Sequence, residues 1–140
     1  MQKYDIVIDT NVFISALKSS RGASFKLISN IDSGLFTTNI SVPLIIEYEA
    51  VSKRGEVKIS TEAINDILDY ICANSIERKI HYLWRPFLKD PKDDMILELA
   101  VESNSKFIIT YNVKDFKGIE EFGIRAITPK EFIEIIGLKS

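Results

Sequence analysis

The sequence predicts an α/β protein in which helices cover both faces of a mostly parallel β-sheet. Short β-branched runs, of which Tyr4 to Ile8 is the clearest, alternate with helical patterns along the chain. Such runs, apolar at nearly every position, are typical of strands buried on both faces. The 140 residues contain no repeat, linker or low-complexity tract, so the chain is expected to form one domain over residues 1–140.

The first half of the chain is expected to form a strand, two helices, a second strand and two more helices, over residues 4–8, 12–17, 23–33, 35–40, 44–51 and 60–73. Gly34 ends the second helix as a C′ glycine would. Pro43 stands in the first turn of the third helix, and Ser60 or Thr61 caps the fourth. The fourth helix carries one apolar stripe, formed by Ile64, Ile67, Leu68, Ile71 and Cys72.

The second half begins with an extended piece over 76–83, followed by Trp84-Arg85-Pro86. Asp90 then caps a helix over 91–104 that has Pro91 in its first position and an acidic first turn. Two further strands are expected over 107–110 and 124–127. A last helix begins at Thr128-Pro129, runs through Ile136 and is stopped by Gly137.

Composition excludes several classes of protein. With 46% hydrophobic and 27% charged residues, the chain is not intrinsically disordered. Its net charge of −2 gives no general positive field, so nucleic acid would have to be bound by a local basic rim. Cys72 is the only cysteine and is expected to be a small buried residue of its helix. No signal peptide and no apolar run of membrane-spanning length is found, which predicts a soluble cytoplasmic protein without membrane contact.

Acidic and polar residues follow the predicted strands. Ligands of parallel sheets bind outside the carboxyl ends of the strands, near the point where the strand order reverses. Asp9 directly follows the first strand, and Thr110-Tyr111-Asn112 follow the fourth. Asp93 and Asp94 lie in the first turn of the helix that feeds the fourth strand and are expected near its far end. Which of these acids come together is left to the fold.

Glu47 is the most informative acid, because it lies on the inward stripe Leu44–Glu47–Val51 with no Lys or Arg three or four residues away. Glu49, in contrast, can pair with Lys53 on the surface. Two carboxylates about 4 Å apart repel by about 4 kcal/mol at an effective dielectric of 20, so gathered acids require a cation. Oxygen ligands without histidine or thiolate select Mg²⁺ or Mn²⁺, which activate water for attack on a phosphodiester.

Each of these residues also has a purely structural explanation. Asp9 and Asp90 can be helix N-caps, and Asp93 and Asp94 can complement a helix dipole. Glu47 can reach solvent or an unseen lysine. Asn112 and Asp115 can be turn formers. The ordered spacing of the residues, rather than any single one, favours a shared site.

Four segments occur in a characteristic order: Val7 to Val12 with D-T-N, Pro43 to Val51 with Glu47, the D-P-x-D-D box at Asp90 to Asp94, and Phe107 to Phe116 with T-x-N-x-x-D-F. From Ile6 to about Phe132, this order resembles the PIN-domain nuclease family, which includes the VapC-type toxins of bacterial and archaeal toxin–antitoxin pairs. Asp94 precedes Thr110 by sixteen residues, the interval expected for the third acid of the family.

The resemblance implies a three-layer α/β/α fold with a five-stranded, mainly parallel sheet. It implies that Asp9, Glu47 and Asp94 are catalytic and bind Mg²⁺ or Mn²⁺. Further metal ligands are expected to come from Asp93, Asn112 and Asp115; many family members have aspartate where this chain has Asn112. Residues that hydrogen-bond to the acids are expected to be Thr10, Asn11 and Thr110.

The resemblance further implies a metal-dependent endoribonuclease, the toxin component of a type II toxin–antitoxin system. The implied partners are an RNA substrate, a cognate antitoxin protein and a second copy of the chain, with the helix over 60–73 as a candidate interface. Cations near the four segments would bind RNA phosphates, and those expected to do so are Arg21, Arg54, Arg85, Lys92 and Lys114. His81 is expected to be a surface or strand histidine and Trp84 a core residue.

Two other functions fit the same residues. One is a non-catalytic RNA- or protein-binding module on the same scaffold, which need not take up a metal ion. The other is phosphoryl transfer with Asp9 as nucleophile. The second is disfavoured because Asn11 stands where another aspartate would act as acid and base.

Overall fold

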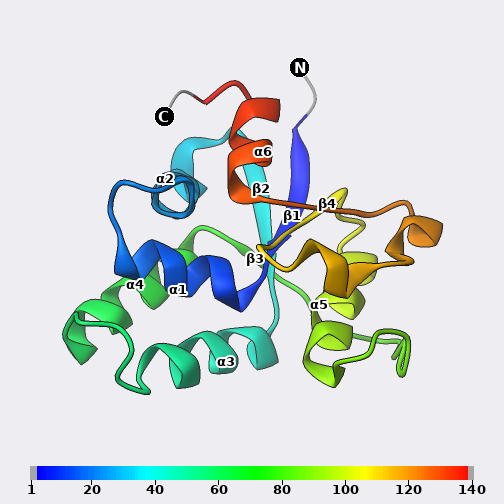
Figure 1. Ribbon diagram of the computed structural model, residues 1–140, viewed down its shortest axis with the longest axis horizontal. Coiled ribbons are helices and arrows are strands. Elements are labelled where there is room, and N and C mark those ends of the chain that lie inside the picture. Colours follow the sequence, from blue (N-terminus) through cyan, green and yellow to red (C-terminus); the bar gives the residue numbers. More distant parts are fainter. Residues whose placement is uncertain (1–2, 139–140) are drawn as a thin grey trace.

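The computed structural model describes residues 3–138 and confirms the predicted fold class (Figure 1). Five strands form one sheet in the order β3-β2-β1-β4-β5, and every neighbouring pair is parallel. The strands are β1 (Tyr4–Ile8), β2 (Phe36–Ile40), β3 (Ile76–Glu77), β4 (Phe107–Ile109) and β5 (Arg125–Ile127).

Helices connect the strands and cover both faces of the sheet. They are α1 (Thr10–Lys18), α2 (Ala23–Ser29), α3 (Val42–Ser52), α4 (Thr61–Ala73), α5 (Pro91–Glu102) and α6 (Pro129–Ile135). Three short 3₁₀ turns add to them: η1 (Ile31–Ser33), η2 (Val113–Phe116) and η3 (Ile119–Phe122). Among residues 3–138, no helix is both long and apolar enough to span a bilayer.

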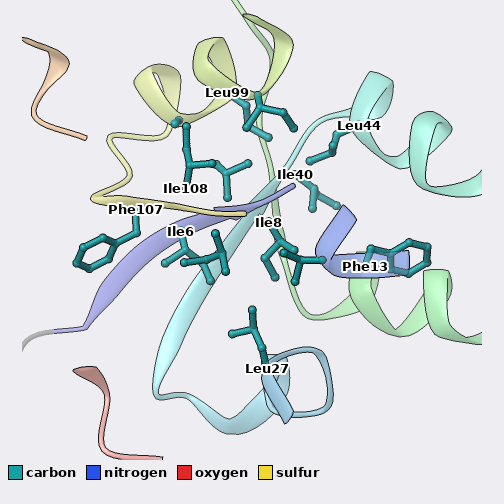
Figure 2. Close-up of a cluster of buried hydrophobic side chains, with 14 of the residues drawn as sticks. Ile6, Ile8, Phe13, Leu27, Ile40, Leu44, Leu99, Phe107 and Ile108 are labelled. Atoms are coloured by element: carbon teal, nitrogen blue, oxygen red, sulfur yellow. The ribbon is translucent and has the colours of Figure 1, made fainter. Parts of the chain in front are cut away.

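The two faces of the sheet bury separate apolar layers (Figure 2). On one face, Ile6 and Ile8 point toward Phe13 of α1 and Leu27 of α2. On the other, Ile108 points toward Leu99 of α5. Each of these side chains is at most 1% exposed. Burial of one such side chain stabilises the fold by roughly 1.5–3 kcal/mol, so the two layers together fix the sheet between its helices.

Three details differ from the sequence-based expectations. The helix expected over 23–33 ends at Ser29 and continues as η1, after which Gly34 takes a left-handed conformation with φ of 83°. The extended piece over 76–83 forms a strand only at Ile76 and Glu77, because β2 ends at Ile40 and offers no further partner. Cys72 is exposed rather than buried, because it lies at the edge of the α4 stripe.

The strand order reverses between β1 and β4, and this point positions the site. The chain moves from β1 to β2 and β3 on one side, then returns so that β4 pairs with the other side of β1. The amide of Asp9 donates to the carbonyl of Ile109 at 2.9 Å, joining the carboxyl ends of β1 and β4. A crevice is expected outside such a switch point in any open parallel sheet.

Candidate active site

Asp9 occupies the carboxyl end of β1, and hydrogen bonds fix its side chain. The Thr10 amide donates to Oδ1 at 2.8 Å, and the Thr110 hydroxyl donates to Oδ2 at 2.8 Å. The Asn11 amide group also donates to Oδ2, at 3.4 Å. Asp9 therefore caps α1 and lies, 7% exposed, at the mouth of the crevice. Burial raises the pKa of Asp9, the bonds from Thr110 and Thr10 oppose that shift, and the charges of Glu47 and Asp115 add to it.

The loop after β4 is tied to the beginning of α1 through the same residues. The Thr110 hydroxyl accepts from the Asn112 amide at 3.0 Å and from Asn11 Nδ2 at 3.4 Å. The Tyr111 amide donates in turn to Asn11 Oδ1 at 3.3 Å. These contacts hold Asn112 beside Asp9, although about a hundred residues of chain separate the two segments.

Glu47 comes from α3 and faces the same crevice. The Thr10 hydroxyl donates to Glu47 Oε2, which links α3 to the first turn of α1. The next residue, Tyr48, is fully buried; its hydroxyl donates to the carbonyl of Ile8, and its ring stacks on Phe13 at 4.6 Å. Tyr48 is not among the site residues predicted from the sequence; its signal there is a hydroxyl-bearing ring within an apolar helix face. Tyr48 anchors α3 to the end of β1 and so positions Glu47.

One open pocket at this edge of the sheet is strongly acidic. Six carboxyl-bearing side chains line it against two lysines, and the eight are Asp9, Glu47, Glu56, Asp90, Asp93, Asp115, Lys18 and Lys92. Thr10, Asn11, Ser15 and Asn112 complete its polar wall. Partial burial, followed by the charges of Asp9, Asp90, Asp115 and Glu47, raises the pKa of Asp93 to about 7. The pocket therefore concentrates negative charge that its own lysines do not neutralise.

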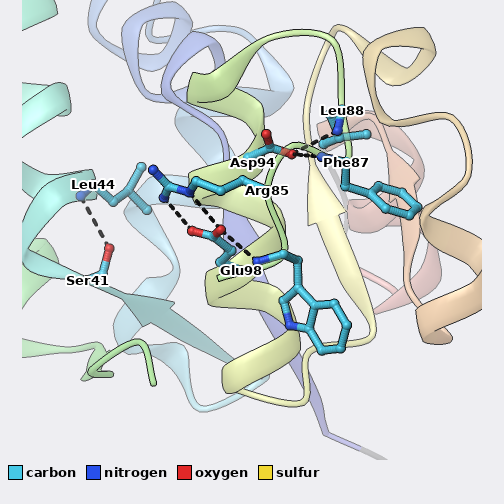
Figure 3. A network of polar contacts seen from close by, with 8 residues as sticks. Ser41, Leu44, Arg85, Phe87, Leu88, Asp94 and Glu98 are labelled. Atoms are coloured by element: carbon cyan, nitrogen blue, oxygen red, sulfur yellow. Dashed lines mark hydrogen bonds and ion pairs between the residues drawn. The ribbon is translucent and has the colours of Figure 1, made fainter. Parts of the chain in front are cut away.

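Asp94 does not line this pocket, which differs from the expectation that it joins Asp9 and Glu47. Its side chain is 1% exposed, and Oδ1 accepts from the amides of Phe87 and Leu88 at 3.2 and 2.8 Å (Figure 3). Neighbouring residues of an α-helix project about 100° apart, so Asp93 and Asp94 face different surroundings. The structure brings Asp9, Glu47 and Asp93 to the pocket and assigns Asp94 to the loop before α5.

The donor set suits a hard divalent cation. All the acidic groups offer oxygen, and no histidine or cysteine lines the pocket. Over residues 3–138, however, no three Asp, Glu, His or Cys side chains are grouped as ready ligands of one ion. Asp9 and Glu47 are held by hydrogen bonds, whereas Asp115 is exposed and Asp93 is half-buried. The residues thus fit a metal ion in their chemistry, with the more exposed carboxylates free to adjust.

The cations expected to contact RNA occupy different places. Lys92 lines the acidic pocket, whereas Arg21 and Arg54 are exposed outside it, and Lys114 lines a separate hollow beside η2. Arg85 forms an ion pair with the buried Glu98: its Nη2 lies 2.6 Å from Glu98 Oε1, and its Nε donates to Oε2 at 2.9 Å (Figure 3). The guanidinium of Arg85 therefore already has a carboxylate partner, although its side chain is 45% exposed, and contact with RNA stays a prediction.

Glu98 is a second residue that sequence analysis missed. It is 2% exposed and also accepts from the Trp84 amide at 2.9 Å. The sequence pattern that could have identified Glu98 is its position four residues after Asp94, on the same inward face of the helix. Together the two acids of α5 pin the backbone of residues 84–88. His81 is a surface residue beside Glu102, and Trp84 is half-buried with its ring edge-on to Phe122 at 5.0 Å.

The comparison with protein families decides which family the chain belongs to, because the sequence model of the PIN-domain family matches residues 5–114. The chain belongs to the PIN-domain family. The resemblance expected from the four segments is thereby confirmed, together with the α/β fold of the family. No curated protein matches the sequence of this PIN domain.

A solved structure shares the fold of this PIN domain. It is a chain in the crystal structure of VapBC2 from Rickettsia felis bound to a DNA fragment from their promoter. The TM-score is 0.61 at 17% sequence identity, over 87% of this chain and 96% of that chain. At that identity the similarity concerns the fold, so the five parallel strands and their helices are what the two proteins have in common.

Proposed function

We propose that this PIN domain is a Mg²⁺- or Mn²⁺-dependent endoribonuclease that hydrolyses RNA phosphodiester bonds. The observation that carries the proposal is the acidic pocket at the switch point of the sheet, whose lining includes Asp9, Glu47, Asp93, Asn112 and Asp115. In the proposal, Asp93 takes the role that the sequence suggested for Asp94. Membership of the PIN-domain family supports nuclease activity independently of this geometry.

The proposed roles follow from how each side chain is held. When bound, a divalent cation supplies a Lewis acid that lowers the pKa of water and stabilises charge on the leaving oxygen. Asp9 would be the fixed ligand, because Thr10 and Thr110 hold both of its oxygens. Glu47 would be oriented by Thr10, and Asp93 would lose its proton on binding the ion. Asn112 and Asp115 would complete the ligand set from the loop after β4.

We further propose that the chain is the toxin of a type II toxin–antitoxin pair and acts in the cytoplasm. The support is its fold, which it shares with a chain in the crystal structure of VapBC2 bound to a promoter DNA fragment. The partners would be an RNA substrate, a cognate antitoxin and a second copy of the chain through α4. Co-purification with the protein encoded beside it, followed by inhibition of RNA cleavage by that protein, tests this assignment.

Cleavage of a labelled RNA pool tests the nuclease directly. We expect cleavage with Mn²⁺ or Mg²⁺, none in EDTA, and loss of at least about a hundredfold in Asp9→Asn and Asp93→Asn proteins. Lys106→Gln, at the opposite end of the sheet, is the control for preparation and folding and should retain full activity. Cleavage that continues in EDTA, or that both Asn variants retain, would refute the proposal.

One observation favours a second candidate, a non-catalytic RNA- or protein-binding module. Among the described residues, no three potential ligands are already grouped around one point. Isothermal titration with Mn²⁺ separates the two functions. The nuclease requires saturable uptake of the ion that Asp9→Asn abolishes, whereas a binding module gives no heat beyond dilution.

A further inference from the structure

The loop that leads into α5 combines basic and aromatic side chains. Residues 78–92 hold five Lys or Arg against one Asp, in a chain whose net charge is −2. Lys79, Lys89 and Lys92 are exposed. Arg85 is paired with Glu98, so these three lysines carry the exposed positive charge of the segment, as expected for a local contact with a polyanion.

Aromatic rings of this segment form a continuous cluster with the half-buried Phe122, and two of its rings are exposed. Tyr82 packs on Trp84 with ring centroids 4.5 Å apart, Trp84 meets Phe122 of η3, and Phe87 meets Phe122 at 5.2 Å. Tyr82 is 63% exposed and Phe87 37%. Rings that face solvent beside lysines can stack with unpaired bases, whereas rings of an ordinary core cannot.

Hydrogen bonds to two buried acids hold the backbone of the cluster at Trp84, Phe87 and Leu88. Glu98 accepts from the Trp84 amide, and Asp94 accepts from the amides of Phe87 and Leu88. Both acids come from α5 and are at most 2% exposed. Because the backbone is fixed before any ligand arrives, little conformational entropy is lost when the rings stack on one.

The Phe87 end of the cluster lies close to the acidic pocket along the chain. Phe87 is three residues before Asp90, which lines that pocket, so at most about 11 Å of extended chain separates them. Lys92, from the same segment, lines the pocket itself. Aromatic rings, lysines and the acidic pocket therefore follow one another along one stretch of chain.

We infer that residues 78–92, with Phe122, form a binding track for single-stranded RNA that delivers the strand to the acidic pocket. The inference rests on the proposed ribonuclease function and adds the part of the substrate that is recognised, namely unpaired bases next to the scissile phosphate. Lysines hold the phosphates of the strand, and the rings of Tyr82 and Phe87 stack on its bases. A duplex hides its base faces and is bound only through its phosphates.

Binding measured without cleavage tests the track. A fluorescently labelled, mixed-sequence single-stranded RNA is titrated with the full chain in EDTA and followed by anisotropy. We expect Tyr82→Leu to weaken binding at least about fivefold, and Tyr82→Leu/Phe87→Leu further. Phe25→Leu is the matched control: Phe25 is 41% exposed on α2, away from the track, and its replacement should leave the Kd unchanged. Tyr82 is largely solvent-exposed, so the single variant folds normally, as thermal melting would verify.

Charge and strandedness provide two more readouts. Lys89→Gln should reduce the slope of log Kd against log salt by about 0.7, whereas Lys106→Gln should not. Binding of an RNA duplex should be insensitive to Tyr82→Leu. An unchanged single-strand Kd in Tyr82→Leu overturns the track, as does an equal loss for duplex. Disruption of a dimer by Tyr82→Leu with RNA binding intact also overturns it and assigns the cluster to a protein interface.

The track and the nuclease fail separately. Weakened binding by Tyr82→Leu in EDTA, without any cleavage by the wild type in Mn²⁺, supports the track and refutes the nuclease. Metal-dependent cleavage with an unchanged Kd in Tyr82→Leu supports the nuclease and refutes the track.

Discussion

The hydroxyl of Thr110 donates to Asp9 Oδ2 at 2.8 Å across 101 residues of sequence. Both residues come immediately after neighbouring strands, so the register of β1 against β4 sets the distance between them. Thr110 is fully buried. The bond therefore couples the stability of the sheet to the position of the acid at its edge.

Thr110→Val should reduce the free energy of unfolding by about 1–3 kcal/mol, because Asp9 then loses a buried charged hydrogen bond. Metal-dependent cleavage should fall as well, since Oδ2 is no longer held. Urea denaturation gives the first quantity and the RNA assay the second. Thr38→Val is the matched control: Thr38 is also buried, but its hydroxyl has no partner, so its replacement should cost about 0.5 kcal/mol or less. Equal losses in the two variants would contradict the role given to Thr110.

Arg85→Met should destabilise the fold by about 2–3 kcal/mol. Glu98 would keep only the Trp84 amide as partner while remaining buried, and the cost stays below that of a fully buried pair because the Arg85 side chain is 45% exposed. Lys53→Met removes the exposed i, i+4 pair with Glu49 and should cost about 0.5 kcal/mol or less. Chemical denaturation gives the free energy of unfolding of both variants. A loss for Arg85→Met no larger than for Lys53→Met would show that Glu98 needs no counter-ion.

Asp93→Asn and Asp94→Asn should have opposite effects. Asp93→Asn removes a carboxylate from a crowded acidic pocket, so it should raise the metal-free Tm and abolish cleavage. Asp94→Asn weakens the bonds that hold Phe87 and Leu88, so it should lower the Tm. Thermal melts in EDTA, beside the cleavage assay, compare the two. A stabilised Asp94→Asn protein would mean that Asp94 and not Asp93 carries the crowded charge.

The contribution of Asp93 to metal-free stability should fall as the pH rises from about 4 to about 7. The folded-state pKa of Asp93, about 7, exceeds its ordinary value of 3.8, so the folded state binds the extra proton throughout this window. The stabilisation from this proton is greatest at a pH below 3.8 and is lost as the pH rises through the folded-state pKa. Asp9 shifts in the same direction. Melting in EDTA across this range should show a steeper decline for wild type than for Asp93→Asn, and Mn²⁺ should remove the difference. Parallel pH profiles for the two proteins would contradict the shift.

Local sequence patterns predicted the fold well, because buried parallel strands and capped helices have signals within a few residues. The strand ends at Asp9 and Thr110 were predictable for the same reason. The choice between Asp93 and Asp94 was not, because it depends on how α5 is rotated about its axis when Ile96 and Leu97 are buried against the sheet.

The internal partners of Arg85 were equally hidden from the sequence. A guanidinium on a loop has the same local signal whether it faces solvent or a buried acid. Only the packing of the loop against α5 shows that the guanidinium of Arg85 pairs with Glu98. The same packing holds the backbone from Trp84 to Leu88 in place. Exposure of Cys72 was also undetermined, since a residue at the edge of an apolar stripe is covered only where a neighbouring element lies over it.

The acids of the pocket are distributed along the sequence from position 9 to position 115. A ribosome must therefore synthesise most of the polypeptide before these groups can meet, and any nascent fragment that ends before Asn112 lacks both Asn112 and Asp115. If the mature protein cuts RNA, its emerging precursor cannot attack the message from which it is being translated.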